Sequence, residues 1–133
     1  MKQGDQFFHD FEVTREIYQG FIQLFKDRND LHTSRAFAMS MGFKSEVMHG
    51  NILNGFLSYF VGECLPVRNV IIHTQEIKYP NPVYLGDRLK FSAEVSEVFE
   101  SIGACEFHFR FCKENNVCVG QGKIQVGFLP SIS

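Results

Sequence analysis

Residues 49–65 read His49-Gly50-Asn51-Ile52-Leu53-Asn54-Gly55-Phe56-Leu57-Ser58-Tyr59-Phe60-Val61-Gly62-Glu63-Cys64-Leu65, and Pro66 follows. Large apolar side chains in this run cover more than one face of a helix, so the pattern predicts a helix over 49–65 that is buried on most sides. Such a helix would be about 25 Å long. Each glycine inside it costs about 1 kcal/mol, so tertiary packing has to stabilise it. We expect this helix to be the centre of the fold.

The rest of the chain is predicted to be mostly strands. Before the helix, residues 7–13 have a short β-like pattern, and Thr14 is placed to cap a helix with an apolar stripe. After Pro66 the sequence is β-rich, and apolar residues alternate with polar ones most clearly in residues 88–100. The strands expected after Pro66 cover residues 67–79, 88–100, 105–112 and 117–128.

This order of elements predicts the architecture. A meander of antiparallel strands with one apolar face needs an element to cover that face. The segment hydrophobic enough to do so is the 49–65 helix. We therefore predict an α+β fold in which an antiparallel sheet wraps around a long central helix, an arrangement called the hot-dog fold. Because the chain has 133 residues and no repeat or linker, we expect a single domain over residues 1–133.

Composition excludes several classes of partner. The formal net charge is −2, which argues against nucleic acid or an anionic membrane as a partner held by bulk electrostatics. The longest apolar run is too short and too interrupted to span a membrane. The four cysteines show no Cys-x-x-Cys spacing and no secretory segment precedes them. We therefore expect reduced thiols, a cytoplasmic protein and no metal site.

A short polar segment precedes the helix and holds a carboxylate and an imidazole. Asp27 and His32 are five residues apart, so in a continuous helix they would point about 140° away from each other. The turn-forming residues Arg28-Asn29-Asp30 lie between them and can bring them together. An adjacent acid and imidazole can hold one water and move a proton in each direction. Taken alone, the same pattern also fits two solvated surface residues.

Four blocks of sequence, in order, resemble the MaoC-like family of (R)-specific enoyl-CoA hydratases. The family's hydratase motif is roughly Gly-Asp-x-Asn-Pro-hydrophobic-His followed by five residues and Ala. The corresponding blocks here are Asp27-x-Asn29-x-Leu31-His32 with Ala38, Val47-Met48-His49-Gly50-Asn51-Ile52-Leu53, Leu65-Pro66 and Tyr79-Pro80-Asn81-Pro82-Val83-Tyr84-Leu85-Gly86-Asp87. The last block resembles the family's Phe-x-x-Pro-Val-x-x-Gly-Asp.

The resemblance implies a lyase of fatty acid metabolism that hydrates trans-2-enoyl thioesters of CoA or acyl-carrier protein, without a cofactor. Asp27 and His32 would be the catalytic residues that hold and deliver the water. The backbone N–H of Gly50 would bind the thioester carbonyl, since the first N–H groups of a helix lack partners and carry positive partial charge. The resemblance adds His49 and Asn29 as candidates for the same site, with a structural role favoured for each. A homodimer is also implied.

Two departures from the family pattern keep alternatives open. Phe25-Lys26 replaces Ser-Gly before the aspartate, and Asp30 replaces the proline. One alternative is a hot-dog thioesterase, although the only acid in the predicted helix, Glu63, would be about 20 Å from its N-terminus. The other is a protein that binds acyl thioesters without catalysis.

Overall fold

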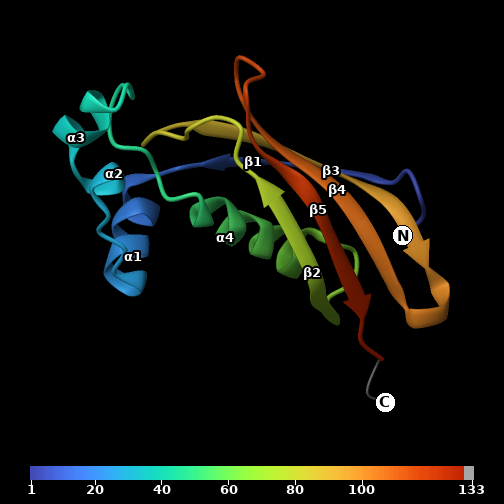
Figure 1. Ribbon diagram of the computed structural model, residues 1–133. Coiled ribbons are helices and arrows are strands. Elements are labelled where there is room, and N and C mark those ends of the chain that lie inside the picture. Colours follow the sequence, from blue (N-terminus) through green and yellow to red (C-terminus); the bar gives the residue numbers. More distant parts are fainter. Residues whose placement is uncertain (131–133) are drawn as a thin grey trace.

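The computed structural model describes residues 1–130, and the strands in that range form one antiparallel sheet (Figure 1). The order across the sheet is β1-β3-β4-β5-β2, with β2 and β1 at the two edges. Neighbouring strands pair antiparallel throughout. The strands are β1 (Gln6–Glu12), β2 (Val70–Lys78), β3 (Arg88–Phe99), β4 (Ala104–Lys113) and β5 (Cys118–Phe128).

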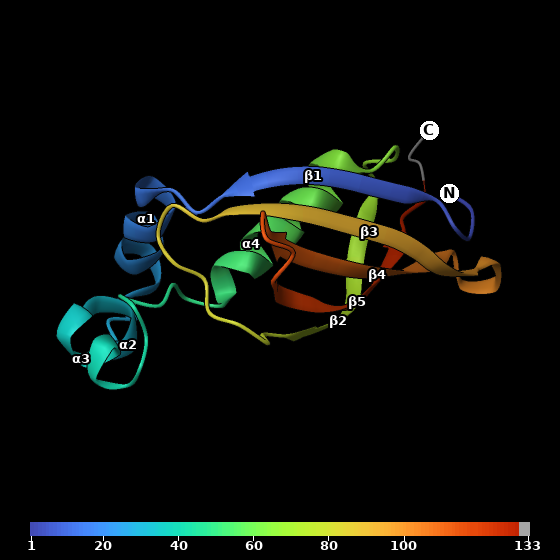
Figure 2. The same cartoon turned by 90° about the horizontal axis from the view of Figure 1, so that it is seen from above.

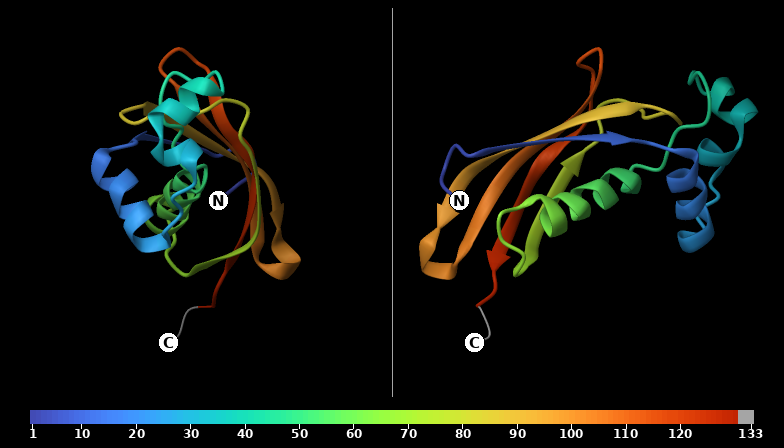
Figure 3. Two further views of the ribbon diagram at one scale, coloured as in Figure 1. Left: turned by 60° about the vertical axis from the view of Figure 1, so that its left-hand side comes forward. Right: turned by 180° about the vertical axis from the view of Figure 1, so that it is seen from behind.

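The central helix, α4, lies against the concave face of the sheet (Figures 2 and 3). The α-helices of the described chain are α1 (Arg15–Phe25), α2 (Asp30–Thr33), α3 (Arg35–Ser40) and α4 (Asn51–Tyr59). A π-helical turn, Phe60–Cys64, continues α4, and a 3₁₀ turn, Glu100–Ile102, joins β3 to β4. The predicted hot-dog arrangement is therefore confirmed, with the sheet curved around one helix.

Alternation along the strands decides which side chains reach the helix. In β3, residues Leu89, Phe91, Ala93 and Val95 are buried while their neighbours are not. The same pattern in β4 buries a row of cysteine and phenylalanine side chains. The aromatic rings of this face pack edge-on and tilted against Phe60 of the central element, as in the Phe60–Phe91 contact with ring centroids 4.8 Å apart. The members of this aromatic core are Phe7, Phe11, Phe56, Phe60, Phe91, Phe107, Phe109 and Phe111.

The central helix predicted over 49–65 is present from Asn51 to Cys64, and its winding changes within this range. The α-helix covers Asn51–Tyr59, and a π-helical turn follows over Phe60–Cys64. The apolar pairs in this segment repeat every four residues, whereas an α-helix has 3.6 residues per turn, so each pair would rotate by about 40° from the last. The wider i→i+5 winding of the π turn turns the chain less per residue. It keeps Leu65 on the buried side before Pro66 ends the element.

The three short helices α1–α3 gather at one end of the sheet, beside the N-terminal end of α4 (Figures 1 and 3). Thr14 caps α1 as predicted, because its hydroxyl accepts a hydrogen bond from the N–H of Ile17 at 3.2 Å. Val47 and Met48 then lead into α4, with the N–H of Met48 bonded to the carbonyl of Val83 at 2.8 Å. This path places the loop between α1 and α2 next to the first turn of α4. None of the helices within residues 1–130 has the length and apolar character needed to cross a membrane.

Candidate active site

The loop between α1 and α2 is held by side chains that bond to its own backbone. The N–H of Asn29 donates to Asp27 Oδ1 at 3.1 Å, and the N–H of Leu31 donates to Asn29 Oδ1 at 3.1 Å. Thr33 Oγ1 donates to the carbonyls of Arg28 and Asn29, each at 3.2 Å. Asn29 is therefore the N-cap of α2 and braces the loop. This local network gives the turn that the sequence required between Asp27 and His32.

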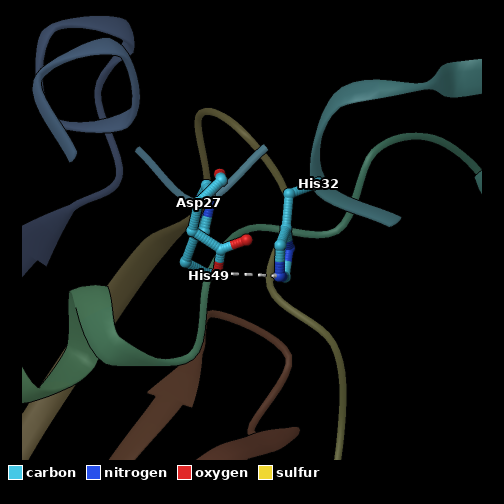
Figure 4. Close-up of side chains that lie close together, drawn as sticks. All are labelled: Asp27, His32 and His49. Atoms are coloured by element: carbon cyan, nitrogen blue, oxygen red, sulfur yellow. Dashed lines mark hydrogen bonds and ion pairs between the residues drawn. The ribbon is translucent and has the colours of Figure 1, made fainter. Parts of the chain in front are cut away.

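Asp27 and His32 face each other across this turn (Figure 4). His32 Nε2 lies 3.9 Å from Asp27 Oδ2, which is too long for a direct hydrogen bond. His32 Nδ1 lies 2.8 Å from the carbonyl oxygen of Val47. Because a carbonyl only accepts, Nδ1 carries the proton, and in the neutral ring Nε2 presents its lone pair toward Asp27. The spacing and the tautomer suit a water held between the two side chains.

His49 links the loop between α1 and α2 to the start of α4. It is 3% exposed, and its Nε2 donates to the main-chain oxygen of Asp27 at 2.9 Å. Its ring is stacked on that of His32, with centroids 4.0 Å apart, and packs on Phe21 at 4.6 Å. Burial lowers the pKa of His49, which keeps this imidazole neutral. The second nitrogen, Nδ1, is buried without a hydrogen-bond partner in the described chain.

Asp27, His32 and His49 have side-chain donor atoms within 4.8 Å of one another, a set that includes metal-ligand types. Their orientation does not suit chelation. The rings of His32 and His49 are stacked at an interplanar angle of 27°, so their lone pairs lie in two nearly parallel planes and do not readily converge on one ion. His49 Nε2 also donates its proton to Asp27. The cluster therefore fits proton chemistry better than metal binding.

Gly50 stands at the first turn of α4, opposite the Asp27–His32 pair. The N–H groups of Gly50 and Asn51 make no hydrogen bond within residues 1–130, as expected at a helix start. A Cβ on Gly50 would lie 3.0 Å from Cε1 of Tyr79, so glycine leaves room for this ring at the helix start. The Tyr79 ring occupies that space, which the sequence could not reveal because Tyr79 is far away along the chain.

Two cavities meet at Asp27 and Asn51. One has a volume of about 590 Å³ and contains the Asp27–His32 pair, Gly50 and Tyr79. The other is a groove of about 820 Å³ between α1 and α4, with a largely apolar lining that includes the exposed side chains of Leu24 and Phe25. Asp27 and Asn51 line both. A ligand at the Asp27–His32 pair can therefore extend in two directions, one of which is strongly apolar.

A network of polar side chains lies beside Gly50. Asn54 Nδ2 donates to Asn51 Oδ1 at 2.8 Å and to the Tyr79 hydroxyl at 2.9 Å. Gln75 Nε2 donates to Asn54 Oδ1 at 2.6 Å. The one sequence feature that could have indicated this network is Tyr79, the tyrosine of the Tyr79–Asp87 block, because the family pattern has phenylalanine there.

The chain is similar to known proteins in sequence and in fold. Residues 4–111 match the MaoC like domain family. The 3-hydroxybutyryl-CoA dehydratase of Methylorubrum extorquens is 30% identical over 87 residues, which are 65% of this chain and 55% of that protein. The (R)-specific enoyl-CoA hydratase of Aeromonas caviae is 32% identical over 80 residues, 60% of each chain. The chain thus spans little more than half the length of these curated relatives.

The fold has a close match among solved structures. An (R)-hydratase from A. caviae involved in PHA biosynthesis superposes with a TM-score of 0.88 over 97% of this chain and 98% of that chain. At 23% identity, this match bears on the fold alone. The family match, by contrast, covers most of the sequence and includes the loop, the helix start and the Tyr79–Asp87 block. This protein belongs to the MaoC-like domain family.

Proposed function

We propose that this protein catalyses the reversible hydration of trans-2-enoyl thioesters to (R)-3-hydroxyacyl thioesters, carried by CoA or by acyl-carrier protein. One observation carries the proposal. The Asp27 carboxylate and the His32 Nε2 lone pair lie 3.9 Å apart in one cavity with the unpartnered N–H of Gly50. The cavity therefore holds a proton-transfer pair and a carbonyl-binding group together, which are the two parts that hydration requires. Similarity to hydratases and a dehydratase supports the same reaction.

The pair would act on a bound water. His32 Nε2 accepts one proton of the water while the water oxygen bonds to C3 of the enoyl group. The imidazolium then returns that proton to C2, so one molecule of water is added in total. Asp27 accepts a hydrogen bond from the water and stabilises the positive imidazolium beside it. Val47 holds the Nδ1 proton through its carbonyl, which keeps the reactive nitrogen pointed at the water.

The N-terminus of α4 would stabilise the negative charge that develops on the substrate. Addition to C3 moves negative charge onto the thioester oxygen. The free N–H groups of Gly50 and Asn51 stand at the positive end of α4 and can donate to that oxygen. Their charge is preorganised, so it favours the enolate over the neutral ground state.

The acyl chain would enter the groove between α1 and α4. This groove begins at Asp27 and continues along apolar side chains. Its members on the two helices are Ile17, Phe21, Leu24, Phe25, Ile52 and Phe56. Burying an acyl chain there contributes about 0.8 kcal/mol for each methylene, so chains that fill the groove would bind better.

The thioesterase alternative is poorly served by the geometry. Glu63 lies in the π turn at the opposite end of the central element from Gly50. Its carboxylate is paired with Arg68, with an Arg68 Nη1–Glu63 Oε2 distance of 2.9 Å. Hydrogen bonding to Arg68 also lowers the pKa of Glu63. A paired, exposed carboxylate distant from the carbonyl-binding group is a weak candidate for attack on a thioester.

The proposal is tested by incubating the protein with enoyl-CoA substrates from short to long chain length. The (R)-3-hydroxyacyl product is expected on chiral analysis, and no free thiol should be released. Thiol release that persists in Asp27→Asn would instead identify a thioesterase. Tight binding of acyl-CoA without turnover on any chain length would identify a binding protein.

A homodimer and a cytoplasmic location complete the proposal. Strand β2 is at the sheet edge and is exposed along most of its length, including the apolar side chains of Ile71 and Ile72. An edge of this kind favours pairing with another strand. Pairing with β2 of a second copy would continue the sheet across the two chains. The four cysteines are unpaired, which suits a reducing compartment.

A further inference from the structure

Tyr79 lies where the catalytic cavity opens to solvent. It follows strand β2 and is 46% exposed. Its ring covers the start of α4, because a Cβ built on Gly50 would be 3.0, 3.2 and 3.3 Å from three of its ring atoms. The same ring lines the cavity that contains Asp27 and His32. Tyr79 thus forms one wall of the opening, directly beside the group assigned to bind the thioester carbonyl.

The hydroxyl of Tyr79 is held in place but has a proton to donate. It accepts a hydrogen bond from Asn54 Nδ2 at 2.9 Å. Asn54 is itself fixed from both sides by Asn51 and Gln75. The Tyr79 O–H proton has no acceptor within residues 1–130. A phenol can donate and accept at once, so this hydroxyl is an oriented donor at the cavity mouth.

The orientation of the bound substrate determines which of its groups lies near the Tyr79 hydroxyl. On the function proposed above, the acyl chain occupies the apolar groove between α1 and α4. The other side of the thioester, the thiol arm, must then leave through the remaining opening, past Tyr79. In CoA and in acyl-carrier protein alike, this arm carries an amide that follows the sulfur after an ethylene group. An amide carbonyl is an acceptor that suits a phenolic O–H.

We propose that Tyr79 is a substrate-positioning residue whose hydroxyl donates to an amide carbonyl of the pantetheine-type arm, while its ring closes the Gly50 side of the cavity. This inference rests on the proposed function. The carrier arm would be held on one side of the thioester and the acyl chain on the other. The thioester oxygen would then be fixed against the N–H of Gly50.

The test is a binding measurement with ligands that cannot be hydrated. Affinity is measured by calorimetry for butyryl-pantetheine and for an alkyl thioester of matched length in which methylene groups replace the amides. Tyr79→Phe removes the hydroxyl and keeps the ring. It should weaken butyryl-pantetheine binding about threefold to tenfold, the range of one neutral hydrogen bond, and leave the alkyl thioester unaffected.

Tyr59→Phe is the matched control. Tyr59 is 48% exposed, lies on α4 and is not part of the cavity lining. It should bind both ligands as the wild type does. Equal affinities of wild type and Tyr79→Phe for butyryl-pantetheine, or equal losses for both ligands, would overturn the inference. So would a wild type that binds neither ligand.

Turnover separates this inference from the proposed function. If the wild type hydrates enoyl-CoA but Tyr79→Phe binds butyryl-pantetheine normally, only the role of Tyr79 is refuted. If ligand binding depends on the Tyr79 hydroxyl but no enoyl thioester is hydrated, the hydratase function is refuted and the contact to the arm stands.

Discussion

The imidazole rings of His32 and His49 are stacked with their centroids 4.0 Å apart, and the two rings hold opposite parts of Asp27. His32 faces the carboxylate, whereas His49 donates to the main-chain oxygen. The Asp27–His32 pair is therefore supported by the buried imidazole of His49, which immediately precedes α4. Changes that charge or remove His49 should first lower the stability of the fold and then disturb the arrangement of Asp27 and His32.

The pKa of His49 predicts a loss of stability in mild acid. Burial lowers this pKa below its ordinary value of 6.5, so the unfolded chain binds the proton at a higher pH than the folded chain does. Stability should be complete above about pH 6.5 and should fall as the pH decreases toward the folded-state pKa, by at most about 1.4 kcal/mol per pH unit for this group. Urea unfolding between pH 8 and pH 5 measures this, and the slope should be smaller in His49→Gln. Parallel curves for the two proteins would contradict the assignment.

Asp27→Asn should abolish most of the activity with little change in folding. Asparagine keeps an oxygen for the N–H of Asn29, so the loop is preserved. The carboxylate that orders the water and stabilises the imidazolium is lost, and the rate of enoyl-CoA hydration should fall about 10²- to 10⁴-fold. The hydration rate of His32→Ala should fall by a similar factor. Asp30→Asn removes the same charge three residues away, at the first position of α2, and serves as the control. Equal rates in Asp27→Asn and Asp30→Asn would remove Asp27 from the mechanism.

Lys26→Gly should stabilise the protein by about 0.5–1 kcal/mol. Lys26 ends α1 with φ 62° and ψ 20°, a left-handed conformation that costs a side chain about 1–2 kcal/mol. Glycine removes this strain, although its greater freedom in the unfolded chain offsets part of the gain. The related family pattern has glycine at this position. Arg28→Gly, in the same loop but without a positive φ, should give no gain in chemical denaturation.

Gly122→Ala should be strongly destabilising, by about 3 kcal/mol or more. Its Cβ would lie 1.9 Å from the carbonyl oxygen of Glu76 on strand β2, and a backbone atom cannot rotate away. Gly20→Ala is the contrasting case. It lies within α1 with nothing in contact with a new Cβ, so it should stabilise the helix by about 0.5–1 kcal/mol. Thermal unfolding that ranks the two in the reverse order would show that β5 relaxes away from β2.

The proposed dimer should depend on β2 and not on β1. Ile71→Lys places a charge on the exposed edge strand β2 and should convert a dimer into a monomer in sedimentation velocity. Phe8→Lys alters an even more exposed apolar residue, at 73%, on the opposite edge strand, and should leave the dimer intact. A wild type that sediments as a monomer at micromolar concentration would refute the dimer itself.

Much of the fold was predictable because strand alternation is a local signal. The buried positions Leu89, Phe91, Ala93 and Val95 followed directly from their spacing. The Thr14 cap was predictable for the same reason, since a cap depends on a few adjacent residues. The length of the central α-helix was not, because an apolar repeat of four residues fits an α-helix nearly as well as one that ends in a π turn.

In the candidate site, too, local features were predictable from the sequence and long-range contacts were not. The sequence by itself determined that Asp27, Asn29 and His32 lie in one short polar segment with turn-forming residues, because that is a property of neighbours along the chain. Only the tertiary structure decided that His49 stacks on His32 and that Tyr79 fills the space beside Gly50. Those contacts join segments far apart in sequence, and their geometry is set by how the sheet curves around α4. The order of residues along the chain does not show which distant segments come into contact.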